Sequence, residues 1–61
     1  MTIAQKILSR FNTETATGAQ ELERECQWIA TSSSAANCFD RVWTFYDGST
    51  ITKTRDGYMV K

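Results

Sequence analysis

Residues 39–60 read FDRVWTFYDGSTITKTRDGYMV, and the fold follows from this stretch. Along residues 39–46, one set of side chains alternates with another: Phe39, Arg41, Trp43 and Phe45 with Asp40, Val42, Thr44 and Tyr46. This period of two residues, with many strong β formers, is typical of a strand. Asp47-Gly48 and Asp56-Gly57 interrupt the pattern, and Asp-Gly between such runs is a strong hairpin signal. The stretch therefore predicts an antiparallel meander of three strands, over about residues 38–46, 49–54 and 58–61.

The first hairpin needs a particular loop if the apolar side chains are to share one face. With a loop of only Asp47-Gly48, Thr44 would pair with Ile51, and Ile51 would lie on the opposite face from Trp43. A three-residue loop that ends with Gly48 in the left-handed conformation pairs Trp43 with Ile51 instead. This register predicts an apolar face of Phe39, Trp43, Phe45 and Ile51, to which a tight turn at Asp56-Gly57 adds Tyr58 and Val60. It leaves a more polar face of Val42, Thr44, Thr50, Thr52 and Thr54.

The first half of the chain shows the 3.6-residue period of amphipathic helices. The apolar residues of residues 2–12 are Ile3, Ala4, Ile7, Leu8 and Phe11. Thr2 and Gln5 have the spacing of a capping box, which predicts the start of a helix over about 2–12. Leu22, Cys26 and Ile29 predict a second helix over about 18–30, with Thr17 as its N-cap.

Residues 31–37 are small and polar and include three consecutive serines, so we expect a flexible loop there. A chain of 61 residues has no room for two hydrophobic cores. We therefore expect one small α+β domain over residues 1–61. Its architecture is two N-terminal helices packed on one side of a C-terminal three-stranded antiparallel meander.

Composition argues against several classes of function. Lys plus Arg is 7 and Asp plus Glu is 7, so the neutral chain has no basic excess with which to hold nucleic acid. Histidine is absent, which removes the commonest general base and the commonest zinc ligand. No Gly-rich phosphate loop occurs either. We expect a protein that is not an enzyme and holds no metal or cofactor.

The two cysteines fit a reducing compartment. Cys26 lies on the apolar stripe of the second helix, and Cys38 lies where the loop meets the first strand. We read both as small buried side chains with free thiols, the alternative being a disulfide between them. The N-terminus lacks the apolar stretch of a signal peptide, and no segment is long and apolar enough to span a membrane. The expected location is the cytoplasm.

Surplus aromatic residues supply the candidate binding residues. A core this small cannot bury all of them. Trp28, Tyr46 and Tyr58 are the candidates for an interface, the alternative being that some of them belong to the core. Trp28 lies off the apolar stripe, so it either widens the core or stands exposed. Glu21 and Glu25 form an acidic ridge one helical turn apart. The remaining candidates are the basic residues Arg41 and Arg55.

These residues lead to three hypotheses of function. The first is a small accessory protein that binds another protein and forms a homodimer, through the sheet or the flank of the second helix. An inhibitor or modulator of a host enzyme or defence system, encoded by a bacterium or bacteriophage, is its specific form. The second is a binder of a small, nucleotide-type ligand in a pocket between protomers, lined by Trp28, Tyr46 or Tyr58. The third and weaker one is a nucleic-acid binder that uses Arg41, Lys53 and Arg55, because the order of elements resembles winged-helix proteins in outline.

Overall fold

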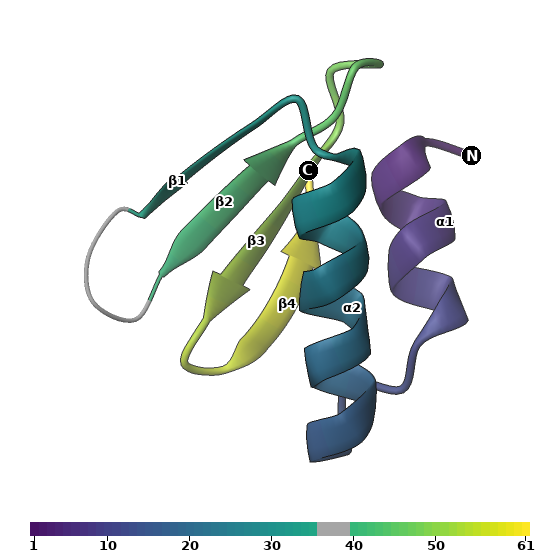
Figure 1. Cartoon of the computed structure of the whole chain (residues 1–61), viewed down its shortest axis with the longest axis vertical. Helices are drawn as coiled ribbons and strands as arrows, with labels where there is room; N and C mark the ends of the chain where they lie inside the picture. Colours follow the sequence, from purple (N-terminus) through teal and green to yellow (C-terminus); the bar gives the residue numbers. More distant parts are fainter. Residues whose placement is uncertain (36–39) are drawn as a thin grey trace.

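Two helices lie on one face of an antiparallel sheet in the computed structural model, which describes residues 1–35 and 40–61 (Figure 1). The helices are α1 (Ile3–Arg10) and α2 (Ala16–Ile29). The strands are β1 (Ser32–Ala35), β2 (Arg41–Thr44), β3 (Thr50–Thr54) and β4 (Gly57–Val60). The described residues thus form an α+β fold whose sheet has the strand order β1-β2-β3-β4.

The prediction of three strands is wrong, because the sheet has four. Part of the expected loop, Ser32–Ala35, forms β1 and pairs with β2 in a continuous antiparallel register from Ser32 opposite Thr44 to Ala35 opposite Arg41. All four β1 residues are exposed, so no hydrophobic pattern marks the strand in the sequence. Backbone hydrogen bonds to the free edge of β2 are enough to order it. The predicted start at residues 38 and 39, with Cys38 and Phe39, lies outside the described residues.

The register of the first hairpin is as predicted. Trp43 pairs with Ile51, and the loop of residues 46–48 is closed by a hydrogen bond from the Phe45 N–H to the Ser49 carbonyl oxygen, 2.9 Å. Gly48 has a φ of +88°, the left-handed conformation that this loop requires. The second hairpin turns one residue earlier than predicted: Thr54 pairs with Gly57, so the tight turn is formed by Arg55-Asp56 and not by Asp56-Gly57.

The second helix begins earlier than predicted. Thr15, and not Thr17, is the N-cap: its side-chain oxygen accepts a hydrogen bond from the Gly18 N–H, 3.0 Å. Thr15 is itself held by the Asn12 carbonyl oxygen, which accepts from its N–H and its hydroxyl. This local loop satisfies the free donors of the first turn better than a cap at Thr17 could. Helix α1 has the predicted capping box of Thr2 and Gln5 but already ends at Arg10.

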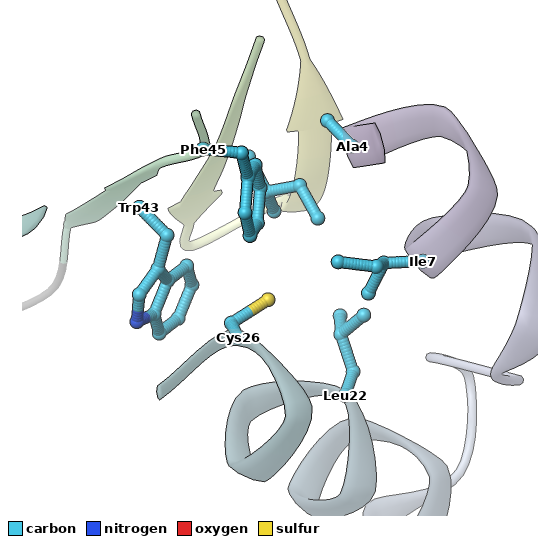
Figure 2. Close-up of a cluster of buried hydrophobic side chains, with 7 residues drawn as sticks. Ala4, Ile7, Leu22, Cys26, Trp43 and Phe45 are labelled. Atoms are coloured by element: carbon cyan, nitrogen blue, oxygen red, sulfur yellow. The ribbon is translucent and has the colours of Figure 1, made fainter. Parts of the chain in front are cut away.

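The hydrophobic core lies between the helices and the sheet (Figure 2). Both helices and the sheet contribute its fully buried members, which are Ala4, Ile7, Leu22, Cys26, Trp43, Phe45 and Ile51. Tyr58 and Val60 pack against this cluster from β4, as the register predicted. The predicted core residue Phe39 lies outside the described residues. Within those residues, neither helix has the length and apolarity needed to cross a bilayer.

Candidate functional site

The outward face of α2 carries the most exposed aromatic side chain of the helices. Leu22 and Cys26 bury the opposite face of the helix, while Trp28 is 86% exposed. Glu21, Glu25 and Trp28 follow one another at helical spacings of four and three residues, so they share one face. This settles the alternative that the sequence left open, because Trp28 is outside the core. We name the surface of Glu21, Arg24, Glu25, Gln27 and Trp28 the Trp28 patch.

A shallow hollow of about 400 Å³ lies on the Trp28 patch. It is lined by Arg24, Glu25, Gln27 and Trp28, all of which belong to α2. Within residues 1–35 and 40–61 the walls of the hollow come from a single helix and face no opposing surface, whereas small-molecule sites bury most of their ligand. The geometry suits contact with another macromolecule better than enclosure of a small ligand.

One acidic residue of the patch is anchored to the neighbouring helix. Glu25 forms an ion pair with Arg10 of α1, in which the Arg10 Nη1 lies 3.5 Å from the Glu25 Oε1. The Arg10 guanidinium also lies over the Phe11 ring, 5.6 Å from its centroid. The pair is largely exposed, so its contribution to stability is small. It does hold the Glu25 side chain toward α1, which leaves Glu21, two helical turns before Trp28, as the exposed carboxylate of the patch.

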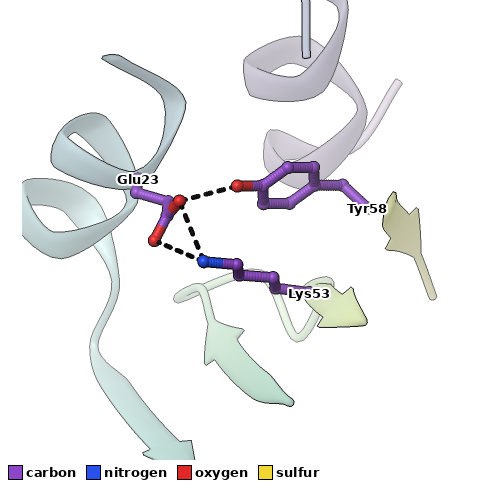
Figure 3. A network of polar contacts seen from close by, with 3 residues as sticks. All are labelled: Glu23, Lys53 and Tyr58. Carbon is purple, nitrogen blue, oxygen red and sulfur yellow. Dashed lines mark hydrogen bonds and ion pairs between the residues drawn. The ribbon is translucent and has the colours of Figure 1, made fainter. Parts of the chain in front are cut away.

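A second polar cluster joins α2 to the sheet (Figure 3). The Lys53 Nζ lies 3.2 Å from both carboxylate oxygens of Glu23, and the Tyr58 hydroxyl donates to the Glu23 Oε2 at 2.7 Å. Lys53 and Tyr58 are register partners on β3 and β4. Burial, together with the hydrogen bond to Glu23, raises the pKa of Tyr58 above its ordinary value. The cluster therefore clamps the helix to the sheet.

The other predicted site residues do not gather around the Trp28 patch. Tyr46 is 80% exposed, but it stands in the loop between β2 and β3. Tyr58 is held by Glu23 at the helix–sheet boundary, and Arg41 lies at the start of β2, opposite Lys53. Arg55 belongs to the turn between β3 and β4. Trp28, Tyr46 and Tyr58 thus do not line one pocket within a single chain.

The cysteine of α2 has low chemical reactivity. Cys26 is a free, fully buried thiol, in agreement with the sequence. Burial raises the pKa of Cys26 to about 12, and the negative charges of Glu23 and Glu25 add to the effect. At neutral pH the group is a protonated thiol, which is a poor nucleophile and a poor metal ligand. Cys38 lies outside the described residues.

No protein-family model, curated protein or solved structure matches this chain. Among residues 1–35 and 40–61, no three His, Cys, Asp or Glu side chains come close enough together to hold a metal ion. The function is therefore inferred from the side chains that the described residues expose.

Sequence reasoning did not place Glu23 and Lys53 in one cluster and did not find the hollow. Glu23 was overlooked because its neighbours Glu21 and Glu25 suggested a uniformly solvated acidic face. Its position directly after buried Leu22 is the available signal, since such a residue borders the core. Lys53 lies two residues after Ile51, so the alternation of β3 already places both on the helix-facing side. The hollow beside Trp28 depends on the packing of side chains and left no signal in the sequence.

Proposed function

We propose that this protein works without catalysis by binding another protein through the Trp28 patch. The observation that carries the proposal is the 86% exposure of Trp28 on a helix whose opposite face is fixed in the core. An exposed indole on a rigid helix loses little conformational freedom on binding and buries a large apolar area. Tryptophan is accordingly among the residues that dominate the energy of protein interfaces.

The patch indicates the chemistry of the partner. Trp28 fits an apolar cleft, and the exposed carboxylate of Glu21 lies on the same face of α2. A Lys or Arg at the rim of that cleft would complement Glu21, and an Asp or Glu would complement Arg24, the exposed cation of the same patch. We propose a partner with an apolar cleft bordered by side chains of both charges. A modulator that covers a functional surface of an enzyme or defence protein would act in this way.

Photo-crosslinking tests which surface is used. A benzophenone amino acid placed at Gln27 lies beside the hollow, and one placed at Met59 lies on the sheet, where that side chain is 47% exposed. In cells that contain the partner, the Gln27 probe is expected to form one discrete adduct that Trp28→Ala abolishes. An adduct from Met59 but not from Gln27 would assign binding to the sheet and overturn the proposal.

The affinity for the purified partner then measures how much Trp28 contributes to binding. Trp28→Ala is expected to weaken the affinity about 30-fold, the equivalent of a loss of about 2 kcal/mol at an interface hot spot. Gln20→Ala, an exposed change on the same helix, serves as the matched control and should alter the affinity less than twofold. Because Trp28 lies outside the core, its replacement should leave the free energy of unfolding within about 0.5 kcal/mol. Equal affinities of the two variants would refute the role of Trp28.

A further inference from the structure

The edge strand β1 is exposed to solvent on both faces of the sheet. All four of its residues are exposed, including Ser33 and Ala35, which the register places on the helix-facing side with buried Trp43. Figure 1 shows why: the helices stand over the β3–β4 side of the sheet, and β1 forms the opposite edge. The helix layer therefore leaves room for another strand beside β1.

The hydrogen-bond pattern shows which groups of β1 point outward. The Phe45 N–H donates to the Ser49 carbonyl oxygen, so alternate residues of β2 up to Phe45 bond to β3. The intervening residues, Val42 and Thr44, then bond to β1, and their register partners there are Ser34 and Ser32. By the same alternation, the backbone N–H and C=O groups of Ser33 and Ala35 point away from the sheet. No residue in the part of the chain that the structure describes, 1–35 and 40–61, bonds to these outward groups, so they form an open row of donors and acceptors.

Nothing within β1 protects this edge from pairing. Natural edge strands are blocked by charged side chains, proline or a bulge, and Ser32–Ala35 has none of them in its unbroken register. The other edge strand, β4, differs in its surroundings, because α1 packs against it whereas every residue of β1 is exposed. The two edges of the sheet are therefore unequal, and β1 is the edge with the freer approach for a further strand.

We propose that β1 pairs antiparallel with β1 of a second copy of this chain. A two-fold axis at Ser34, perpendicular to the sheet, places Ser33 opposite Ala35 of the second copy, and the reverse. Each of these pairs exchanges both of its hydrogen bonds, so every outward backbone group of Ser33 and Ala35 is used. The two sheets become one continuous sheet, and both helix layers lie on the same face.

The second copy is the occupant that the chemistry of this edge favours. The side chains that meet across the axis are serine and alanine, which neither clash nor repel. The whole chain has a formal net charge of zero, so two copies do not repel each other at long range. A domain of this size also buries a small fraction of its surface, and pairing adds to that burial.

Sedimentation velocity of the full chain at increasing concentration, up to about 1 mM, tests the proposal. The mass is expected to rise from the 6.9 kDa of one chain to twice that value. Ser33→Pro removes an N–H that points outward and no hydrogen bond to β2, so it should weaken self-association at least tenfold. Ser33→Ala keeps the backbone donor and should dimerise like the original chain.

Two further variants separate loss of the β1 interface from loss of the fold and from loss of partner binding. A synthetic chain with a methyl group on the Ser33 backbone nitrogen loses the same donor without the proline ring, which covers the case that Ser33→Pro does not fold. Trp28→Ala should still dimerise, because Trp28 belongs to the outward face of α2, so this interface and the proposed binding function can fail separately. A monomer at every concentration would overturn the proposal. So would a dimer that survives both changes at Ser33.

Discussion

Gly18 shows how a single residue sets the place where a loop meets a helix. It is buried in the first turn of α2, and a Cβ atom there would overlap the carbonyl oxygen of Asn12 and come within 2.8 Å of the Thr15 Oγ1. Asn12 and Thr15 are the residues that hold the cap of α2. The glycine is therefore required by close approach of the backbone, and its φ plays no part.

We expect Gly18→Ala to destabilise the protein by about 1–3 kcal/mol, the usual cost of forcing an atom into a packed site. Helix propensity predicts the opposite sign, because alanine is favoured over glycine by about 1 kcal/mol inside a helix. Chemical denaturation measures the difference. Thr17→Ala, the exposed neighbour, is the control and should be neutral or slightly stabilising. A Gly18→Ala variant of raised stability would contradict the steric argument.

At the scale of elements, the loop between β2 and β3 completes the N-terminus of α1. The Asp47 Oδ2 accepts from the Ile3 N–H at 3.0 Å, and the buried Ser49 Oγ accepts from the Ala4 N–H at 3.1 Å. Thr2 satisfies the next two donors of the helix with its side chain and its carbonyl oxygen. All four N–H groups of the first turn thus have partners, two of them from residues more than 40 positions away along the chain.

This cap should make stability depend on pH. Hydrogen bonds from the Ile3 N–H and from Ser49 lower the pKa of Asp47 below its ordinary value of 3.8. A carboxylate whose pKa is lower in the folded state contributes stability that is fully present above the unfolded-state pKa. That contribution is lost as the pH falls through the folded-state pKa. We expect Asp47→Asn to flatten the acid limb of the stability curve below about pH 4, as measured by denaturation at a series of pH values. An unchanged acid limb would refute the role of Asp47.

The cluster of Glu23, Lys53 and Tyr58 joins α2 to β3 and β4 (Figure 3). We expect Tyr58→Phe to cost about 1 kcal/mol, because it removes the 2.7 Å hydrogen bond and leaves the ring packed on the core. Tyr46→Phe is the matched control and should have no effect, since its side chain is 80% exposed in a loop. A double-mutant cycle with Glu23→Ala, which removes the acceptor, should show that the effects of Tyr58 and Glu23 are coupled. Additive effects would contradict the clamp.

At the scale of the whole molecule, the helix layer is narrower than the sheet. Two helices cover Trp43, Ile51 and Phe45, whereas β1 stays exposed on both faces (Figure 1). The molecule therefore presents two different surfaces, a rigid helical face with Trp28 and an unprotected strand edge. The first suits a partner with an apolar cleft and the second suits a further strand. Because they lie on different elements, one can be altered without the other.

Much of the fold was predictable because it depends on neighbours along the chain. The helical period of residues 2–12, the capping box at Thr2 and the left-handed Gly48 each follow from side chains a few positions apart. The pairing of Trp43 with Ile51 also followed, since the loop length and the need for one apolar face leave a single register. The sequence by itself thus determined the α+β class and most of the core.

Only the tertiary structure decided the features that depend on distant residues. Ser32–Ala35 has no hydrophobic pattern of its own and becomes a strand because β2 offers its backbone groups. Trp28 and Tyr58 are similar candidates in the sequence, yet packing leaves the first in solvent and ties the second to Glu23. The cap that Asp47 provides for α1 likewise exists only once the loop and the helix have been brought together. Each depends on a partner far away along the chain, and local patterns of side chains do not identify that partner.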